Sequence, residues 1–229
     1  MKFFNDPSVT AFISDRTVDF TPTDFDAPLN EAQQACLRAQ TGRGIQQVFW
    51  RRQVHADGIV WAKGERADCR QSPDADAFVT NQIGLPIAIR TADCVPVFIF
   101  DPTKKAAGLV HAGWKGTSHR IVEKTVEKME SLFDCWPQDL KIALGPAIRS
   151  CCYQVGPEFK DQFPDEITER EEKFFLDLCL ANQHQLIEVG VPRENIFDSG
   201  ICTCCRKDYF SFRRDGEKAG RMISLMELL

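Results

Sequence analysis

The first half of the chain consists largely of short apolar runs separated by polar or glycine-containing segments. Several of these runs are continuous rather than alternating, which is typical of strands that are covered on both faces. The pattern predicts strands at Val9–Ser14, Gln47–Trp50, Gly58–Ala62, Ala77–Thr80, Pro86–Arg90, Val95–Asp101 and Ala107–His111.

The second half adds positions with a helical period. A helix that begins near Thr117 or Ser118, either of which can cap its free N–H groups, is predicted to carry one apolar stripe. That stripe comprises Ile121, Val122, Val126, Met129, Leu132 and Phe133. A second amphipathic helix is predicted from about Phe174 to Val189, ending at Gly190. Further strands are predicted at Leu140–Leu144, Tyr209–Arg213 and Arg221–Met226. Strands first, with helices mixed in later, indicate a layered α/β/α domain around a mixed β-sheet.

Composition narrows the class of protein. A chain of 229 residues with 43% hydrophobic content can bury a large core, and without repeats or linkers residues 1–229 are predicted to form a single domain. A net charge of −5, with acidic residues spread along the chain, argues against a nucleic-acid surface. The apolar runs are too short to cross a membrane, and the N-terminus has no signal-peptide pattern, so a cytoplasmic protein is expected. In that reducing compartment the ten cysteines are expected to be buried hydrophobes, metal ligands or a nucleophile.

Two of the four histidines lie at the ends of strand-like runs, and a polar interruption separates them. His55 and His111 flank Cys94, which ends the segment TADC between two apolar runs. Such an interruption is costly unless its side chains have buried partners. Two histidines and one cysteine suit Zn²⁺ with a fourth position left open, as in catalytic sites. The spacing alone leaves two alternatives: hydrogen-bonded histidines beside a core cysteine, or a Cys94 nucleophile with His111 as its base.

The flanking residues add candidates for chemistry. Asp93 is predicted either to transfer protons, to orient a ligand imidazole or to cap a turn. The Trp114 ring can face a ligand or pack in the core. Arg213 and Arg214 can bind an anion such as phosphate or remain solvated.

A further group of cysteines is interpreted as thiols in a tight turn. Cys202, Cys204 and Cys205 form the pattern CxCC, and Cys151 and Cys152 are adjacent elsewhere in the chain. We do not expect the pattern CxCC to adopt the knuckle geometry of a CxxC zinc motif, and no histidine lies nearby in the sequence. A second zinc site is therefore the less favoured interpretation.

Several segments together resemble the YfiH-like, laccase-domain family, whose members are called polyphenol oxidoreductases, purine nucleoside phosphorylases or peptidoglycan editing factors. These segments include QVHADGIV, DADAFVT, TADCVPVFIFD, GLVHAGWKGT, ALGPAIRSCCYQVG and YFSFRRDGEKAGR. The resemblance implies a three-layer α/β/α sandwich with zinc ligands His55, Cys94 and His111. It also implies that Arg16 lies close to a nucleoside site. The segment TVDFTPTDFDAP departs from the family pattern, which predicts a reshaped lid over that site.

The same resemblance implies a zinc-dependent purine nucleoside phosphorylase that acts on adenosine, inosine, guanosine and methylthioadenosine, with some adenosine deaminase activity. Asp93, Cys94 and His111 would be catalytic, and Arg16, Trp114, Arg213 and Arg214 would bind nucleoside and phosphate. In deamination, Asp93 is the first candidate for proton transfer. A monomer or small homo-oligomer without nucleic-acid or membrane partners is expected.

Three alternative functions remain open. A polyphenol oxidase with Cu²⁺ in place of Zn²⁺ could use the same ligands, but four histidines cannot build a trinuclear copper cluster as well. A Cys94–His111 hydrolase or amidase could act on cell-wall peptides. A non-catalytic metal-binding module is the third.

Overall fold

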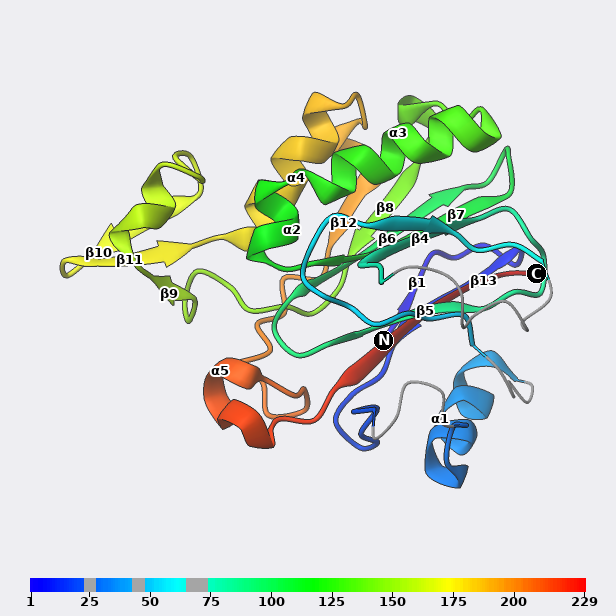
Figure 1. Cartoon of the computed structure of the whole chain (residues 1–229), viewed down its shortest axis with the longest axis horizontal. Helices are drawn as coiled ribbons and strands as arrows, with labels where there is room; N and C mark the ends of the chain where they lie inside the picture. Colours follow the sequence, from blue (N-terminus) through cyan, green and yellow to red (C-terminus); the bar gives the residue numbers. More distant parts are fainter. Residues whose placement is uncertain (23–27, 43–47, 65–73) are drawn as a thin grey trace.

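The computed structural model of the chain describes residues 1–22, 28–42, 48–64 and 74–229, and its centre is a six-stranded sheet (Figure 1). The strands are β3 (Ile59–Trp61), β4 (Ala77–Thr80), β6 (Val95–Asp101), β7 (Ala106–Ala112), β8 (Lys141–Leu144) and β12 (Ile196–Asp198). They lie in the order β12-β8-β6-β7-β4-β3. The outer pairs β12–β8 and β3–β4 are parallel, whereas the inner pairs are antiparallel, so the sheet is mixed as predicted.

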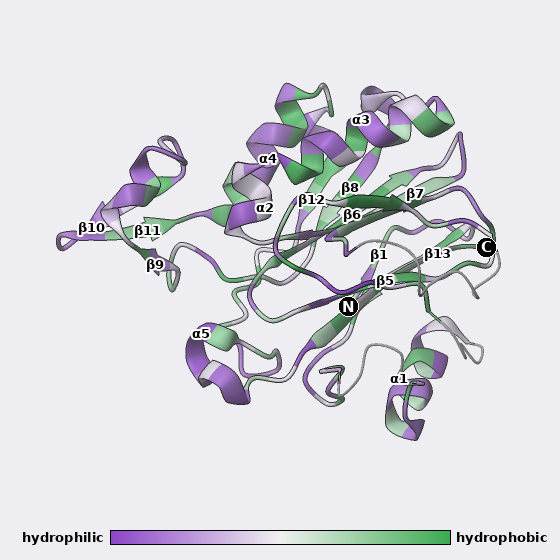
Figure 2. Cartoon of the chain, in the orientation of Figure 1, coloured by the Kyte–Doolittle hydropathy of each residue, from purple (hydrophilic) through white to green (hydrophobic). Residues whose placement is uncertain are grey.

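A second, antiparallel sheet packs against one face of the first. It contains β1 (Lys2–Phe3), β2 (Val9–Ile13), β5 (Ile87–Thr91) and β13 (Met222–Leu228) in the order β1-β2-β13-β5. Phe98 and Leu109 of the six-stranded sheet share one buried cluster with Ile89 and Met226 of the four-stranded sheet. Figure 2 shows how strongly the strands of the central sheet are hydrophobic, which agrees with burial on both faces.

Helices cover the outer faces of the two sheets. α2 (Trp114–Ser118), α3 (Ile121–Phe133) and α4 (Leu178–Glu188) lie over the six-stranded sheet (Figure 1), and α1 (Glu31–Thr41) packs Leu37 against the four-stranded sheet. The buried stripe of α3 packs closely on β7 at Gly108, where an added Cβ would lie 2.8 Å from the Met129 sulfur. The predicted α/β sandwich is therefore confirmed, and its β layer consists of two sheets packed face to face.

Smaller elements complete the described chain. β9 (Gln154–Val155), β10 (Ile167–Arg170) and β11 (Lys173–Leu176) form a three-stranded sheet in the order β10-β11-β9. This sheet projects from the main body (Figure 1), and α5 (Phe212–Asp215) lies near the end of the chain. Short 3₁₀ helices occur at Pro137–Asp139, Pro157–Lys160, Arg193–Asn195 and Gly216–Lys218.

Two predicted helix boundaries were wrong. Thr117 and Ser118 lie inside α2 rather than at a cap, and α3 begins only after Arg120, whose left-handed φ of 60° separates the two helices. Phe174–Leu176 belongs to strand β11, because these residues pair with β9 and β10. The second helix therefore starts at Leu178, where the Asp177 side chain accepts a hydrogen bond from the Leu180 N–H.

Two predicted strands also differ from the structure. Of the predicted strand Tyr209–Arg213, the first three residues lie outside any strand and the last two belong to α5. The Ser211 side chain caps that helix by accepting from the Arg214 N–H. Of the predicted strand Gln47–Trp50, Phe49 makes a single bridge to Ile87, and Gln47 lies outside the described residues. Part of the predicted lid segment, residues 23–27, also lies outside them. Within the described chain, no helix is long and apolar enough to cross a membrane.

Candidate metal centre

The β6–β7 hairpin explains why two distant residues meet. Pro96 pairs with His111 and Val95 pairs with Ala112, so the start of β6 lies beside the end of β7. Cys94 directly precedes β6, and the hairpin therefore brings its thiol to the His111 ring. His55 reaches the same point from the loop that precedes β3.

The three predicted ligands do converge. One ligand atom from each of His55, Cys94 and His111 lies within 4.8 Å of the other two. The two imidazole rings are 4.7 Å apart and nearly perpendicular. His111 is buried, Cys94 is half-buried and His55 is exposed, so the cluster opens toward solvent on the His55 side.

Local backbone features make this approach possible. His55 has a left-handed φ of 58°, an uncommon conformation for a non-glycine residue. A Cβ at Gly113 would lie 3.2 Å from both the Cys94 sulfur and the His55 ring, so a larger residue there would press on two of the predicted ligands at once. The glycine of the HAGW segment is therefore needed for close contact.

Asp76 is the buried residue that organises this cluster. Its Oδ1 lies 2.7 Å from Nδ1 of His111, and its carboxylate also accepts backbone N–H groups of Val54, His55 and Ala56 at 2.9–3.2 Å. Burial alone would raise the pKa of Asp76, but hydrogen bonds from His111 and from the backbone hold that pKa below the ordinary value of an aspartate. Because a carboxylate can only accept, Nδ1 of His111 carries a proton, and Nε2 remains as the atom that can bind a metal.

The thiol and the imidazole also influence each other's ionisation. Burial opposes charge on Cys94, yet the neighbouring His111 and the hydrogen bonds from both histidines lower the pKa of the thiol. The pKa of His111 is raised by Cys94 and Asp76, again against the effect of burial. A thiolate is also the form in which cysteine binds metals.

The donor set fits zinc. Two imidazole nitrogens and one thiolate are ordinary Zn²⁺ ligands, and three protein ligands leave one position of a tetrahedral site open. The hydrogen bond from His111 to a buried carboxylate is the usual second interaction of a metal-binding histidine. His55, Cys94 and His111 are thus the residues that would hold the ion.

Asp93 lies next to the cluster, but its carboxylate faces another segment. Oδ1 accepts the Thr203 hydroxyl at 2.6 Å, and Oδ2 accepts the Arg213 N–H at 2.7 Å. Its backbone carbonyl accepts the Ile148 N–H at 2.9 Å. The orientation of a ligand imidazole, one of the roles predicted for Asp93, belongs to Asp76 instead.

The predicted anion-binding residues have different environments. Arg16 and Arg213 are exposed; Arg16 donates to the Lys207 carbonyl at 3.2 Å, and Arg213 donates to the Gln154 carbonyl at 2.9 Å. The Arg214 guanidinium, in contrast, donates to four backbone carbonyls and to the Asp215 carboxylate.

Two aromatic residues, Trp114 and Tyr153, also lie in this region. The Trp114 ring is half-buried and packs 5.0 Å from the Phe159 ring, so it is not wholly within the core. Tyr153 was not predicted as a site residue; burial and the nearby Cys94 raise its pKa to about 12, and the Arg213 guanidinium lies 5.2 Å from its ring.

Several known proteins are similar to this chain in sequence or in fold. Residues 18–229 match the family of the multi-copper polyphenol oxidoreductase laccase. A purine nucleoside phosphorylase of Clostridium acetobutylicum is 35% identical over 190 residues, which cover 80% of this chain and 77% of that protein. The purine nucleoside phosphorylase YlmD of Geobacillus stearothermophilus is 36% identical over 76% of this chain and 69% of its own length. The crystal structure of the hypothetical protein YfiH of Bacillus licheniformis superposes with a TM-score of 0.85 at 26% identity, covering 100% of this chain and 99% of that one.

Proposed function

This chain belongs to the multi-copper polyphenol oxidoreductase laccase family, and we propose that it is a zinc-dependent purine nucleoside phosphorylase. The observation that carries the proposal is the convergence of His55, Cys94 and His111 around one point, with Asp76 fixing the His111 ring. The names of the relatives supply the reaction, because several are called purine nucleoside phosphorylases. Adenosine, inosine, guanosine and methylthioadenosine are the proposed substrates. The free thiols among the described residues are compatible with the proposed cytoplasmic location.

In the proposed reaction, an oxygen of inorganic phosphate forms a bond to C1′ of the ribose. The bond from C1′ to N9 breaks, its electron pair stays on the purine, and a proton neutralises the leaving base. The products are the free base and ribose 1-phosphate, or 5-methylthioribose 1-phosphate when the substrate is methylthioadenosine. Zinc held by the three ligands would supply a Lewis acid with one open position.

The residues of the chain would bind and orient the two substrates. Arg16 and Arg213 are exposed cations and are the proposed phosphate contacts. Arg214 would act by positioning, since its guanidinium already binds carbonyls and Asp215. The half-buried Trp114 ring would stack on the purine.

A weaker adenosine deaminase activity is part of the proposal. It would replace the C6 amino group by an oxygen from water and release ammonia. Asp93 is the proposed group for proton transfer, although both of its oxygens already accept hydrogen bonds. Each carboxylate oxygen keeps a second lone pair, through which Asp93 would accept the proton.

The test is phosphate-dependent release of base from the four nucleosides by the purified protein. Adenine and ribose 1-phosphate should form from adenosine only when phosphate is present, and Cys94→Ala or prior chelation should abolish both. Cys36→Ala is the matched control, because Cys36 is half-buried and lies outside the cluster. Zinc-loaded protein that releases no base from any of the four nucleosides would refute the proposal.

One observation favours a second candidate, a Cys94–His111 hydrolase acting on cell-wall peptides. Cys94 has a lowered pKa beside His111, as in thiol hydrolases. The two functions respond differently to reagents. Activity on a peptide that survives chelation but is lost on thiol alkylation would support the hydrolase, whereas loss on chelation would support the phosphorylase. Oxidation of a polyphenol only after copper loading would identify the oxidase instead.

A further inference from the structure

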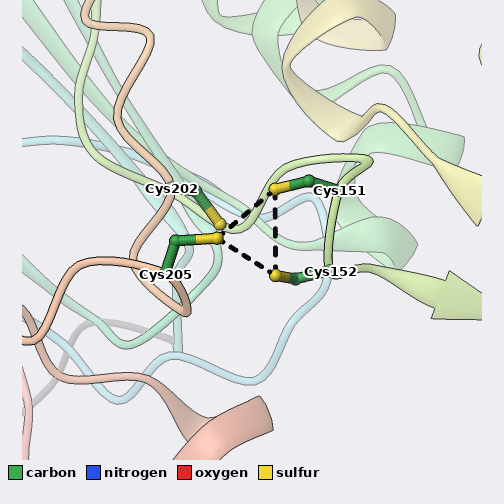
Figure 3. Close-up of side chains that lie close together, drawn as sticks. All are labelled: Cys151, Cys152, Cys202 and Cys205. Carbon is green, nitrogen blue, oxygen red and sulfur yellow. Dashed lines mark hydrogen bonds between the residues drawn. The ribbon is translucent and has the colours of Figure 1, made fainter.

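Four cysteines outside the first cluster bring their sulfur atoms together at the surface. Cys151 and Cys152 lie in the turn before β9, and Cys202 and Cys205 lie in the loop that follows β12. Figure 3 shows the four side chains pointing toward one another from these two loops. All four sulfur atoms lie within 4.8 Å of one another.

The sulfur–sulfur distances match those around a single tetrahedral metal ion. A Zn–S bond of about 2.3 Å places two sulfurs about 3.8 Å apart when the ligands are tetrahedral. The distance is 3.8 Å between Cys151 and Cys152 and 3.7 Å between Cys151 and Cys205. The pair Cys152–Cys205 is closer, at 3.3 Å. A [4Fe–4S] cluster binds each thiolate to a different iron, and a [2Fe–2S] cluster binds the thiolates as two pairs. Either cluster would need some of the sulfurs farther apart than the 4.8 Å found here.

Neither core packing nor disulfide bonding accounts for the four thiols. Cysteine usually serves as a small buried hydrophobe, yet Cys151 and Cys205 are exposed and Cys152 is half-buried. A disulfide requires sulfurs about 2.05 Å apart, which is far shorter than the measured distances, and all four residues are free cysteines.

We propose that Cys151, Cys152, Cys202 and Cys205 form a second, structural zinc site. Cys202 and Cys205 are separated by two residues, which is the CxxC spacing of many zinc ligands, with Cys204 as one of the intervening residues. Four thiolates close the coordination sphere, so this site holds the ion without an open position. The assignment of this site does not rest on the proposed phosphorylase activity.

The structural role of the second site follows from the hydrogen bonds that Thr203, in one of its two loops, makes to other segments. Thr203, between two of the proposed ligands, donates to Asp93, the neighbour of Cys94. The Thr203 N–H also donates to the Ala147 carbonyl at 3.0 Å, which ties this loop to the segment that leads to Cys151. Zinc between the two loops would therefore fix the support of Asp93, and through it the position of Cys94.

Charge near the site is compatible with a thiolate-rich centre. Four thiolates and one Zn²⁺ carry a net negative charge, which requires cations nearby. The Arg213 guanidinium reaches the Cys152 carbonyl at 3.5 Å, and the Arg170 guanidinium donates to the Ser150 carbonyl. Both arginines thus lie beside the backbone of the proposed ligands.

The experiment measures metal content on the full chain, purified under reducing conditions without added chelator. Wild-type protein should contain about two zinc ions per chain and Cys94→Ser about one. X-ray absorption on Cys94→Ser should then show four sulfur ligands at about 2.3 Å and no nitrogen ligand. Cys94→Ser leaves all four cysteines of the proposed second site in place. Its zinc content therefore reports on that site even if substitutions of the four cysteines themselves prevent folding.

Variants of the cluster itself provide the second measurement. Cys152→Ser and Cys205→Ser should each lose about one zinc per chain, whereas Cys204→Ser, in the same loop, should keep both ions. Zinc retained in full by Cys152→Ser and Cys205→Ser would overturn the proposal, as would Cys94→Ser protein that contains no zinc or has a Cys151–Cys152 disulfide. Nucleoside activity does not enter either outcome, so failure of the phosphorylase proposal remains distinguishable.

Discussion

Replacing Asp76 by asparagine removes the charge of the buried acceptor while keeping its shape. Oδ1 accepts from His111 Nδ1 and the His55 N–H, and Oδ2 accepts from the N–H groups of Val54 and Ala56. Whichever oxygen becomes the amide nitrogen, two of these four donors lose their acceptor. If it is Oδ1, the His111 ring is no longer fixed for metal binding.

The structure sets the expected magnitudes. Loss of a hydrogen-bond partner behind a metal-binding histidine lowers metal affinity about 10–100-fold, or about 1.4–2.8 kcal/mol. Two hydrogen bonds to a buried charge are together worth about 3 kcal/mol or more in the free energy of unfolding. Asp76→Asn should therefore weaken zinc binding and destabilise the metal-free protein.

Zinc affinity is measured by competition with a chromophoric chelator, and stability by urea unfolding of metal-free protein. Asp101→Asn is the matched control: Asp101 is also fully buried, and it accepts the N–H groups of Thr103 and Lys104 at 2.8 Å at the far end of β6. It should lose stability without losing zinc affinity at the three-ligand site. Equal zinc affinity in Asp76→Asn and wild-type protein would refute the reasoning.

Four further predictions concern the same region. Gly113→Ala should lower zinc affinity about tenfold in chelator competition, because its Cβ would press on Cys94 and His55 at 3.2 Å while its own φ of −79° suits alanine. In metal-free protein, the lowered pKa of Cys94, about 6, means that alkylation stays fast at pH 7 and slows as pH falls through 6. The attraction between the Cys94 thiolate and the protonated His111 also stabilises the metal-free fold. This stabilisation is lost as pH falls below about 6, because Cys94 gains a proton, and as pH rises above about 9, because His111 loses one. Urea unfolding measured across this pH range tests both losses. Arg214→Ala should lower the free energy of unfolding by about 2–4 kcal/mol in urea, because four carbonyls lose a donor.

The central strands could be predicted because burial on both faces leaves a continuous apolar run. β4 and β6 begin and end at the predicted residues, and β7 differs by one residue at each end. The hairpin register then brings Cys94 to His111 without further information. Local chemistry therefore indicated Cys94 and His111 as candidate ligands, and the topology explains why the two residues meet.

Where tertiary pairing decides the structure, the apolar pattern was misleading. Phe174–Leu176 can extend the stripe of α4, but pairing with β9 and β10 fixes it as a strand. The role of Asp76 depends in the same way on the register of β4 with β7, which places it behind His111. Its segment DADAFVT was part of the family pattern, but the pattern does not show which carboxylate meets a histidine.

The second cysteine cluster illustrates a different limit. Written as CxCC, residues 202–205 conceal the CxxC spacing of Cys202 and Cys205, and the partners Cys151 and Cys152 lie about 50 residues earlier. The parallel bridge from Ala147 to Cys202 brings the two segments together. No local motif could show that convergence.

Asp93 connects the His55–Cys94–His111 cluster to the four-cysteine cluster. Its strained backbone conformation shows why it needs support from the second cluster. Its φ of 89° is unfavourable for a residue with a side chain and persists only where surrounding contacts determine it. Those contacts are the Thr203 hydroxyl, the Arg213 N–H and the Ile148 N–H, all from the segments that carry or adjoin the four cysteines. The conformation turns the chain so that Cys94, the last residue before β6, has its thiol beside His111. A rigid zinc site at the four cysteines would thus hold the strained Asp93, and Asp93 would in turn position Cys94, the proposed zinc ligand of the first cluster.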